Sequence, residues 1–350
     1  MIFYTAFLLC IILLCGRYNI VGQGNVQVHN LKRKYGFFIA IVVIIVISSI
    51  RYGIGYDWYA YENIILRYEN GINWGMYELF DNILFYIGAS LNNVNVSFAL
   101  FAILTYGLVG ITIYNNSVDK FTSLIIYFTI FYLTSLSTIR QALAVAVSFW
   151  AIQFVKRKQP IRFVLSIIVA FCFHRYAFIA LVIYPIWYLP TWIILLGIIL
   201  MVGLYQSILP ALITRFSIAD LFYIDNFKNS SGNFIRIVYL LIFLYCVFLY
   251  VFALIKKRNI AEQVEVMSYL KISLIGVVIP FILGGHTGGR IAEYFLIYIV
   301  LLVPLINRHI SLWERVISML PFYAFYYIFL YTTTKVGTSY IPYMTFFQNK

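Results

Sequence analysis

The sequence predicts an all-α, polytopic membrane protein, and its composition and hydropathy pattern carry the prediction. Of the 350 residues, 63% are hydrophobic and only 11% are charged, whereas a soluble domain carries about 25% charged residues. Apolar runs recur along the whole length, separated by short polar stretches. We therefore expect a single integral membrane domain over residues 1–350 rather than two soluble domains.

About 12 apolar runs are predicted to be transmembrane helices. Several are shorter than the ~20 residues of a full span, so their ends must extend into flanking aromatic residues or lie where the bilayer is thinned. The first run is expected to be retained, because no positively charged region precedes it and no A-x-A-like site follows it. The spans are expected at about 2–15, 36–50, 95–114, 121–135, 139–155, 161–174, 176–189, 191–206, 234–255, 269–284, 290–306 and 311–331.

Segment 74–91 is predicted to be an amphipathic helix that lies on the membrane surface. Its apolar residues follow helical spacing and its polar residues occupy the other side, which is typical of an interfacial helix. The apolar positions are Met76, Leu79, Phe80, Ile83, Leu84 and Ile87, and the polar ones are Glu78, Asp81 and Asn82.

The distribution of charge supports this placement and orients the chain. With segment 74–91 at the surface, most of the 25 Lys and Arg residues fall on one side, including the clusters at 32–34, 156–158 and 256–258. That side is predicted to be cytoplasmic by the positive-inside rule. Both termini and the loops at about 51–94 and 207–233 then face outward. The net charge of +13 is explained by these loops, so we expect no nucleic acid partner.

Arginine dominates the basic residues of the outer side. Its planar guanidinium is suited to bidentate recognition of phosphate or carboxylate. The arginines assigned to this side are Arg51, Arg67, Arg140, Arg175, Arg215, Arg236 and Arg290.

A helix is predicted to begin near Ile139. Thr138, followed three residues later by Gln141, resembles a capping box. Arg140 then lies in the first helical turn, where a cation opposes the helix dipole and costs about 0.3–1 kcal/mol. A bound anion would reverse this cost. The alternative is an arginine that extends to the membrane interface.

The stretch 284–294 is predicted to repeat this design. A glycine-rich loop leads into a helix whose first turn holds Arg290, and the glycines would let a ligand approach the backbone closely. Glu293 shares a helix face with Arg290 and is expected to orient it. The alternative is a flexible loop with a local ion pair.

Two further polar elements are expected at the same face. In the stretch 51–61, glycines alternate with bulky residues, so Arg51 and Asp57 are expected to face one another. The aromatic residues there form either an interface belt or a surface that stacks on sugar rings. His174 lies between two apolar runs, and its ordinary pKa near 6.5 suits general acid–base work; a structural histidine is the alternative.

Four short motifs together resemble the EpsG family, which is similar to the Wzy-type polymerases of bacterial exopolysaccharide and O-antigen assembly. The resemblance runs from about residue 35 to 345. The motifs are Arg51-x-Gly-x-Gly-x-Asp57-x-x-x-Tyr61, Ile139-Arg140-Gln141-Ala142-Leu143-Ala144, Phe173-His174 and Arg290-Ile291-Ala292-Glu293-Tyr294-Phe295.

The resemblance implies a glycosyltransferase of the bacterial inner membrane that works at the periplasmic or exterior leaflet, with a GT-C-like fold as one option. Its substrates would be undecaprenyl-diphosphate-linked glycans, and a chain-length regulator is an implied partner. Arg51, Arg140 and Arg290 would hold the diphosphates, and His174 or Asp57 would accept the proton from the acceptor hydroxyl. Further substrate-binding residues would be Arg175, Glu293, Tyr61 and Gln141.

No cofactor is expected, and the reaction is predicted to be metal-independent because no second acidic residue lies within two positions of Asp57. The four cysteines lie in apolar runs without C-x-x-C spacing, so we expect neither a disulfide nor a zinc site. A transporter or flippase of lipid-linked oligosaccharide remains an alternative, although no internal repeat is visible. A membrane acyltransferase that decorates glycans is the third hypothesis.

Overall fold

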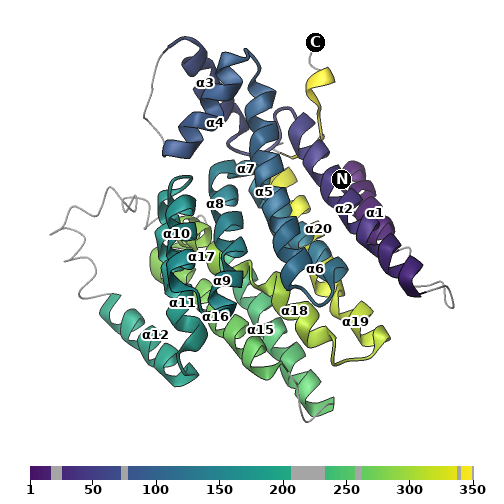
Figure 1. Ribbon diagram of the computed structural model, residues 1–350, viewed down its shortest axis with the longest axis vertical. Helices are drawn as coiled ribbons and strands as arrows, with labels where there is room; N and C mark the ends of the chain where they lie inside the picture. The colour runs from purple at the N-terminus through teal and green to yellow at the C-terminus, as the bar shows by residue number, and fades with distance from the viewer. Residues whose placement is uncertain (17–25, 72–77, 206–232, 257–261, 337–339, 349–350) are drawn as a thin grey trace.

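The computed structural model describes residues 1–16, 26–71, 78–205, 233–256, 262–336 and 340–348 (Figure 1). Within these ranges the regular secondary structure is helical, and one isolated β-bridge joins Arg51 to Thr345. The all-α prediction is therefore confirmed for the described chain. The predicted outer loop 207–233 lies almost wholly outside the described residues.

The first part of the chain forms two long helices, a short helical pair and a central group around the π-helix η1. They are α1 (Ile2–Gly16), α2 (Val26–Ile50), α3 (Trp58–Glu69), α4 (Leu79–Ser90), α5 (Val94–Asn116), α6 (Lys120–Tyr127), η1 (Phe128–Tyr132), α7 (Leu133–Ser137), α8 (Ile139–Trp150) and α9 (Ile152–Lys156).

The second part begins with a bent helical segment and ends with two helix pairs and a short C-terminal turn. Its elements are α10 (Pro160–Phe171), the 3-10 helix η2 (Arg175–Val182), α11 (Ile183–Tyr188), α12 (Thr191–Tyr205), α15 (Asn233–Lys256), α16 (Gln263–Leu283), α17 (Gly285–Leu296), α18 (Ile299–Asn307), α19 (Leu312–Ser318), α20 (Leu320–Val336) and the 3-10 helix η4 (Phe346–Gln348).

Five helical stretches of the described chain are long and apolar enough to cross a membrane, and a sixth span is formed if α17 and α18, bent by 42° at their junction, count as one. Each predicted span overlaps a helical segment, but the other predicted spans fall on shorter apolar stretches, such as Tyr35–Ile50 within α2. By helix length and composition, the described chain therefore does not reach the predicted number of about 12 transmembrane helices. The five stretches are Val94–Asn116, Lys120–Ser137, Phe234–Lys256, Gln263–Leu283 and Leu312–Thr333.

The most deeply buried helices are the central ones, and the peripheral helices turn apolar residues outward. Tyr294 and Tyr298 of the bent α17–α18 segment are fully buried, whereas Ile199 of α12 is 68% exposed and Phe248 of α15 is 60% exposed. An apolar outer surface around a packed interior is what a surrounding bilayer requires, because lipid chains replace water there.

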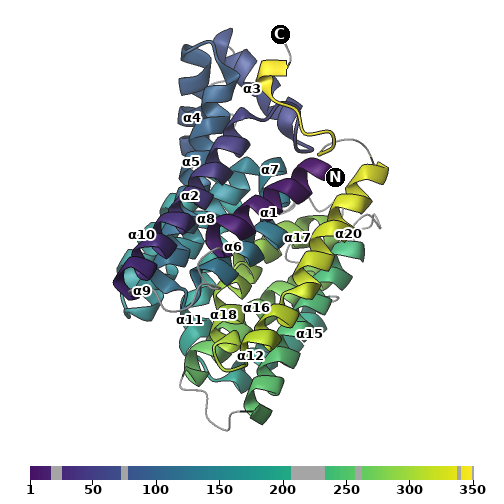
Figure 2. The same ribbon diagram turned by 90° about the vertical axis from the view of Figure 1, so that its right-hand side faces the viewer.

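The described part of segment 74–91 is helical, as predicted, but its polar residues face the protein. Its apolar residues Leu79, Ile83 and Tyr86 are exposed, whereas Asp81 and Asn82 are buried against the protein. The side that faces other helices therefore carries both polar residues and the apolar Leu84 and Phe85, and the exposed side is left for lipid. Figures 1 and 2 show α3 and α4 beside each other at one end of the molecule, near the C-terminus.

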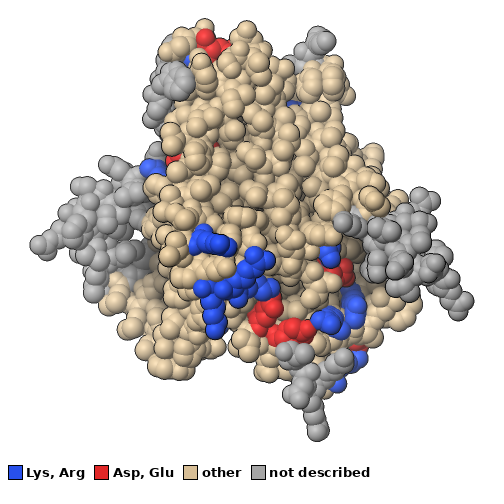
Figure 3. Space-filling view, viewed as in Figure 1, with Lys and Arg blue, Asp and Glu red and all other residues tan. Residues whose placement is uncertain are grey.

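The basic residues gather toward the opposite end. Figure 3 shows Lys and Arg side chains across the lower part of this face, below a broad uncharged surface. Several are paired there with acidic residues, as Lys156 is with Glu265 at 2.5 Å and Arg308 with Glu262 at 2.6 Å. The separation of the charged end from the α3–α4 end agrees with the two-sided charge pattern of the sequence.

Candidate active site

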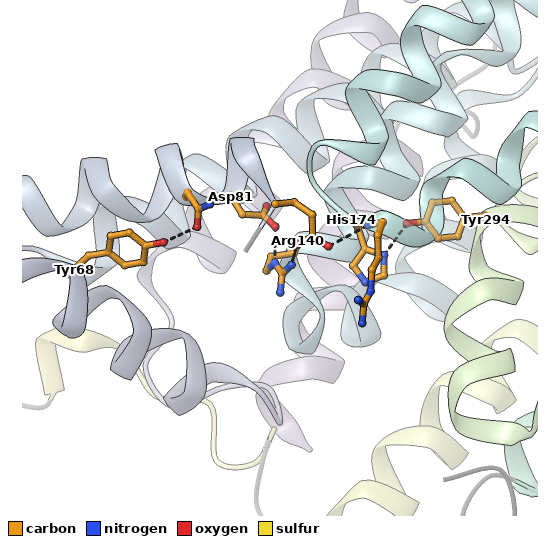
Figure 4. A network of polar contacts seen from close by, with 8 residues as sticks. Tyr68, Asp81, Arg140, His174 and Tyr294 are labelled. Atoms are coloured by element: carbon orange, nitrogen blue, oxygen red, sulfur yellow. Dashed lines mark hydrogen bonds and ion pairs between the residues drawn. The ribbon is translucent and has the colours of Figure 1, made fainter. Parts of the chain in front are cut away.

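Arg140 lies in the first turn of α8, as predicted, and the protein itself supplies the anions beside it. Its Nη2 donates to the Glu78 carboxylate and its Nε to the Asp81 carboxylate, both from the start of α4 (Figure 4). The predicted capping box does not form, because the Thr138 hydroxyl donates to the Thr134 carbonyl at 3.1 Å. The two carboxylates offset the unfavourable position of a cation at a helix start.

Glu78 also fastens α4 to the junction between α10 and η2. Its second carboxylate oxygen accepts a hydrogen bond from the Arg175 backbone N–H at 3.1 Å. Two residues on, the Phe80 N–H donates to the Cys172 carbonyl at 3.0 Å. Sequence reasoning placed Glu78 and Asp81 on the polar side of an amphipathic helix without assigning them a role. Their spacing of three, on that one side, was the signal that a single cation could bind both.

His174 lies in the loop between α10 and η2, outside the candidate spans, and only 9% of it is exposed. Its Nδ1 is 3.3 Å from the Tyr294 hydroxyl (Figure 4). Burial, and then the positive charges of Arg140, Arg290 and Arg175, lower the pKa of the imidazole from 6.5 to about 3. The side chain is therefore neutral near pH 7 and a weak base, which favours the structural reading of His174 over the catalytic one.

Asp57 pairs with Arg290, not with Arg51. The Asp57 Oδ2 atom is 3.7 Å from Arg290 Nη2, and the two side chains are 37% and 38% exposed. Asp57 is the N-cap residue of α3 but makes no side-chain capping bond, so its carboxylate keeps acceptor capacity. The expectation that Arg51 and Asp57 face one another is wrong, because the turn at the two positive-φ glycines directs these side chains apart.

Tyr61 stands one turn beyond Asp57 on α3, and its N–H donates to the Asp57 carbonyl at 3.0 Å. Burial, followed by the negative charge of Asp57, raises the pKa of the Tyr61 hydroxyl, while Arg140 and Arg290 lower it. Tyr61 therefore lies close enough to Asp57, Arg140 and Arg290 for their charges to act on its hydroxyl. It remains a neutral phenol at any physiological pH.

Gln141 of α8 is hydrogen-bonded to two residues of α17, Arg290 and Glu293. Its Nε2 donates to the Arg290 carbonyl at 2.9 Å and to the Glu293 carboxylate at 2.7 Å. Glu293 was expected to orient Arg290; its carboxylate accepts from Gln141, and Thr134 and the charge of Arg290 also act on it. The carboxylate also borders a small cavity of about 20 Å³ lined in part by Tyr127 and Thr134, large enough for one water molecule.

The glycine-rich stretch is part of a helix rather than a loop. Helix α17 begins at Gly285, so Arg290 lies in its second turn, contrary to the prediction. A Cβ atom on Gly288 would be 2.6 Å from the Pro280 Cα atom of α16, and one on Gly276 would be 2.9 Å from the Phe295 Cβ atom. These glycines serve close packing of α16 against α17, as small residues do between membrane helices.

Arg51 is only 2% exposed, and its contacts are with the protein interior. Its guanidinium donates to the carbonyls of Ser48 and Leu136, both at 3.1 Å, and lies 5.2 Å from the Phe98 ring centre. Leu136 belongs to the last turn of α7, where carbonyl groups lack helical partners. Arg51 therefore joins α2 to the end of α7, and the predicted contact with a lipid-linked diphosphate is replaced by this packing role.

The fold thus brings most of the predicted residues to one place, next to the α3–α4 end. Two basic–acidic groups meet there: a largely buried one around Arg140 and a more exposed one at Asp57 and Arg290. Among the described residues no group of three or more His, Cys, Asp and Glu side chains could hold a metal ion. The arrangement offers exposed guanidinium and carboxylate groups for an anion and a proton.

The comparisons with known proteins give one match. The profile of the EpsG family matches residues 34–345, which is most of the chain. Comparison with curated proteins and with solved structures gives no match.

Proposed function

Because the chain belongs to the EpsG family, which suggests a polysaccharide polymerase role, we propose that it is a membrane glycosyltransferase that joins lipid-linked oligosaccharides. The donor is a glycan carried on undecaprenyl diphosphate, and the acceptor is a sugar hydroxyl of a second lipid-linked repeat unit. The product is O-antigen or exopolysaccharide, and the reaction takes place at the periplasmic or exterior leaflet of the bacterial inner membrane.

The observation that carries the proposal is the partly exposed pair of Asp57 and Arg290. Glycosyl transfer from a diphosphate needs a base for the acceptor proton and positive charge for the leaving group. The pair supplies one of each within 3.7 Å. Of the two candidate bases, Asp57 is preferred, because its carboxylate is accessible while the buried His174 has a lowered pKa.

The proposed step transfers the sugar in one displacement. The acceptor hydroxyl oxygen attacks the anomeric carbon of the donor, and a new C–O bond forms as the bond from that carbon to the diphosphate oxygen breaks. The acceptor proton passes to the Asp57 carboxylate, and undecaprenyl diphosphate leaves with its bonding electron pair. Arg290 and Arg175, whose charges both act on His174, stabilise the negative charge that develops on the leaving oxygen.

The neighbouring residues hold these groups in position. Gln141 fixes the α17 backbone at Arg290, and His174 contacts Tyr294 of the same helix. Arg140, held by Glu78 and Asp81, ties α8 to α4 and so keeps the start of α8 in place. Charges that are fixed before substrate binds stabilise a transition state without further reorganisation.

The test uses the purified protein in lipid nanodiscs with an undecaprenyl-diphosphate-linked repeat unit, followed by gel analysis for a glycan ladder. We expect the wild type to form a ladder. The ladder should also form in EDTA, because guanidinium groups supply the positive charge. Arg290→Gln should form no ladder. Arg67→Gln is the matched control, since Arg67 is an exposed arginine at the end of α3.

Two other results would replace the proposal. Movement of the labelled lipid-linked unit across proteoliposome membranes without a ladder would indicate a flippase. A mass increase of the glycan by an acyl group would indicate an acyltransferase. A ladder of wild-type length from Arg290→Gln would remove the diphosphate role.

A further inference from the structure

A second polar pocket lies at the charged end of the molecule, away from the candidate active site. It opens between the start of α6, the end of α18 and α19, whose labels lie together in Figure 1. Its volume of about 340 Å³ falls in the range of small-ligand sites, about 300–1,000 Å³. The lining residues are Val118, Asp119, Pro304, Asn307, Arg308 and Arg315.

The two arginines of this pocket are held in place with donors to spare. Arg315 donates through Nε to the Ile310 carbonyl and through Nη2 to the Arg308 carbonyl, both at 3.1 Å. Arg308 donates from Nη1 to Glu262 at 2.6 Å, and its side chain is 59% exposed. A guanidinium has five N–H donors, so each arginine can still donate to a phosphate in the pocket.

Asp119 brings a negative charge to the same pocket. It caps α6, accepting from the Phe121 and Thr122 N–H groups and, on its other oxygen, from the Thr122 hydroxyl at 2.8 Å. A carboxylate has about four acceptor positions, so one further donor can bind. The pocket therefore combines two cations with one anion that still accepts.

The surroundings of the pocket are those of a membrane interface. On α19, beside Arg315, Leu312 and Trp313 are 67% and 77% exposed, and Ile317 is 60% exposed. Exposed Trp next to basic residues is typical of the headgroup level, and basic pockets between membrane helices bind lipid headgroups.

We propose that this pocket binds the headgroup of a phospholipid that carries both a phosphate and a primary amine, as phosphatidylethanolamine does. Arg308 and Arg315 hold the phosphodiester, and Asp119 accepts a hydrogen bond from the ammonium group. The charge pattern of such a headgroup complements the pocket, whereas phosphatidylglycerol lacks the cation and phosphatidylcholine lacks an N–H donor. The site is independent of the proposed glycosyltransferase activity.

The experiment measures lipid binding to the full-length protein purified in a maltoside detergent. Phosphatidylethanolamine, phosphatidylglycerol, phosphatidylcholine and inorganic phosphate are each added, and native mass spectrometry and the unfolding temperature report binding. The variants are Arg308→Gln and Asp119→Asn. Asparagine caps a helix about as well as aspartate, so Asp119→Asn removes the charge and keeps the start of α6. The control is Arg157→Gln, an exposed arginine at the same end.

We expect retention of phosphatidylethanolamine over the other two lipids, with affinity about tenfold or more lower in Arg308→Gln. Asp119→Asn should bind phospholipids without preferring the amine, and Arg157→Gln should behave as the wild type. Equal binding of the three lipids by the wild type would overturn the proposal. So would inorganic phosphate that displaces the lipid at equal concentration, or unchanged lipid selectivity in Asp119→Asn.

Discussion

Replacing Asp57 with asparagine separates the proposed chemistry from the stability of the fold. The side chain keeps its shape, but the amide that replaces the carboxylate cannot take the proton from the acceptor hydroxyl. Asp57 makes no side-chain capping bond to α3, so the start of that helix should not change. The remaining structural loss is the ion pair with Arg290.

The two effects differ greatly in size. Loss of a general base lowers a rate by about 10²–10⁴-fold, which corresponds to about 3–5 kcal/mol in the barrier. The ion pair joins side chains that are 37% and 38% exposed at a separation of 3.7 Å, and such pairs contribute at most about 1 kcal/mol to stability. We therefore expect a large loss of polymerisation with little change in unfolding.

The assay follows the initial rate of ladder formation from a labelled lipid-linked repeat unit, with thermal unfolding in detergent measured in parallel. The loss should appear in kcat, with KM for the donor changed only a few-fold, because the carboxylate acts on the acceptor proton. Glu69→Gln is the matched control, since it removes an exposed carboxylate from the end of the same helix.

A rate for Asp57→Asn within about threefold of wild type would refute the assignment of Asp57 as the base, since general base catalysis is worth about 10² or more. A large fall in unfolding temperature would show instead that Asp57 is structural. An equal loss in Glu69→Gln would indicate a general sensitivity of α3 to charge.

Asp81→Ala removes one of two carboxylates from the partly buried Arg140 guanidinium, and we expect a stability loss of about 1–3 kcal/mol by chemical unfolding. Glu265→Gln, in a more exposed pair, should cost at most about 1 kcal/mol, and equal losses would contradict this reasoning. Gly288→Ala places a methyl group 2.6 Å from a backbone atom of α16 and should lower the free energy of unfolding by about 1–3 kcal/mol. The control is Gly107→Ala, whose added Cβ atom would have nothing within 4 Å. Equal stabilities of the two variants would show that α16 and α17 are not in such close contact. Because the pKa of His174 falls to about 3 from an unfolded value near 6.5, its stabilising contribution is complete above pH 6.5 and decreases as the pH falls toward 3. His174→Gln should weaken this pH dependence of unfolding, and an unchanged pH profile would argue against a buried neutral imidazole.

The helices were largely predictable because their signals are local. The apolar runs from Ile2 to Val336 all overlap helical segments, and the helix start at Ile139 placed Arg140 in a first turn. The helical spacing of apolar residues in segment 74–91 predicted the helix α4, but not that its polar residues Asp81 and Asn82 would be buried. Each of these features depends on residues within a few turns of one another.

The partners of the charged residues were less predictable. Asp57 pairs with Arg290 rather than Arg51, and the anions beside Arg140 are side chains of α4. Glycines that suggested a ligand-binding loop instead allow two helices to pack closely. In each case the partner lies on another helix, and helix packing determines which faces meet.

By itself the sequence determined the class of protein, the two-sided distribution of charge, the residues that could form a site and the positions of most helices, though not of α3, which lies in the predicted loop 51–94. Apolar periodicity and composition act along the chain, and the polar α3 lacks that signal. Only the tertiary structure decided which carboxylate meets which guanidinium, that Arg51 is buried and that His174 is neutral. Those outcomes depend on distances between helices and on burial from water, which arise once the helices have packed together.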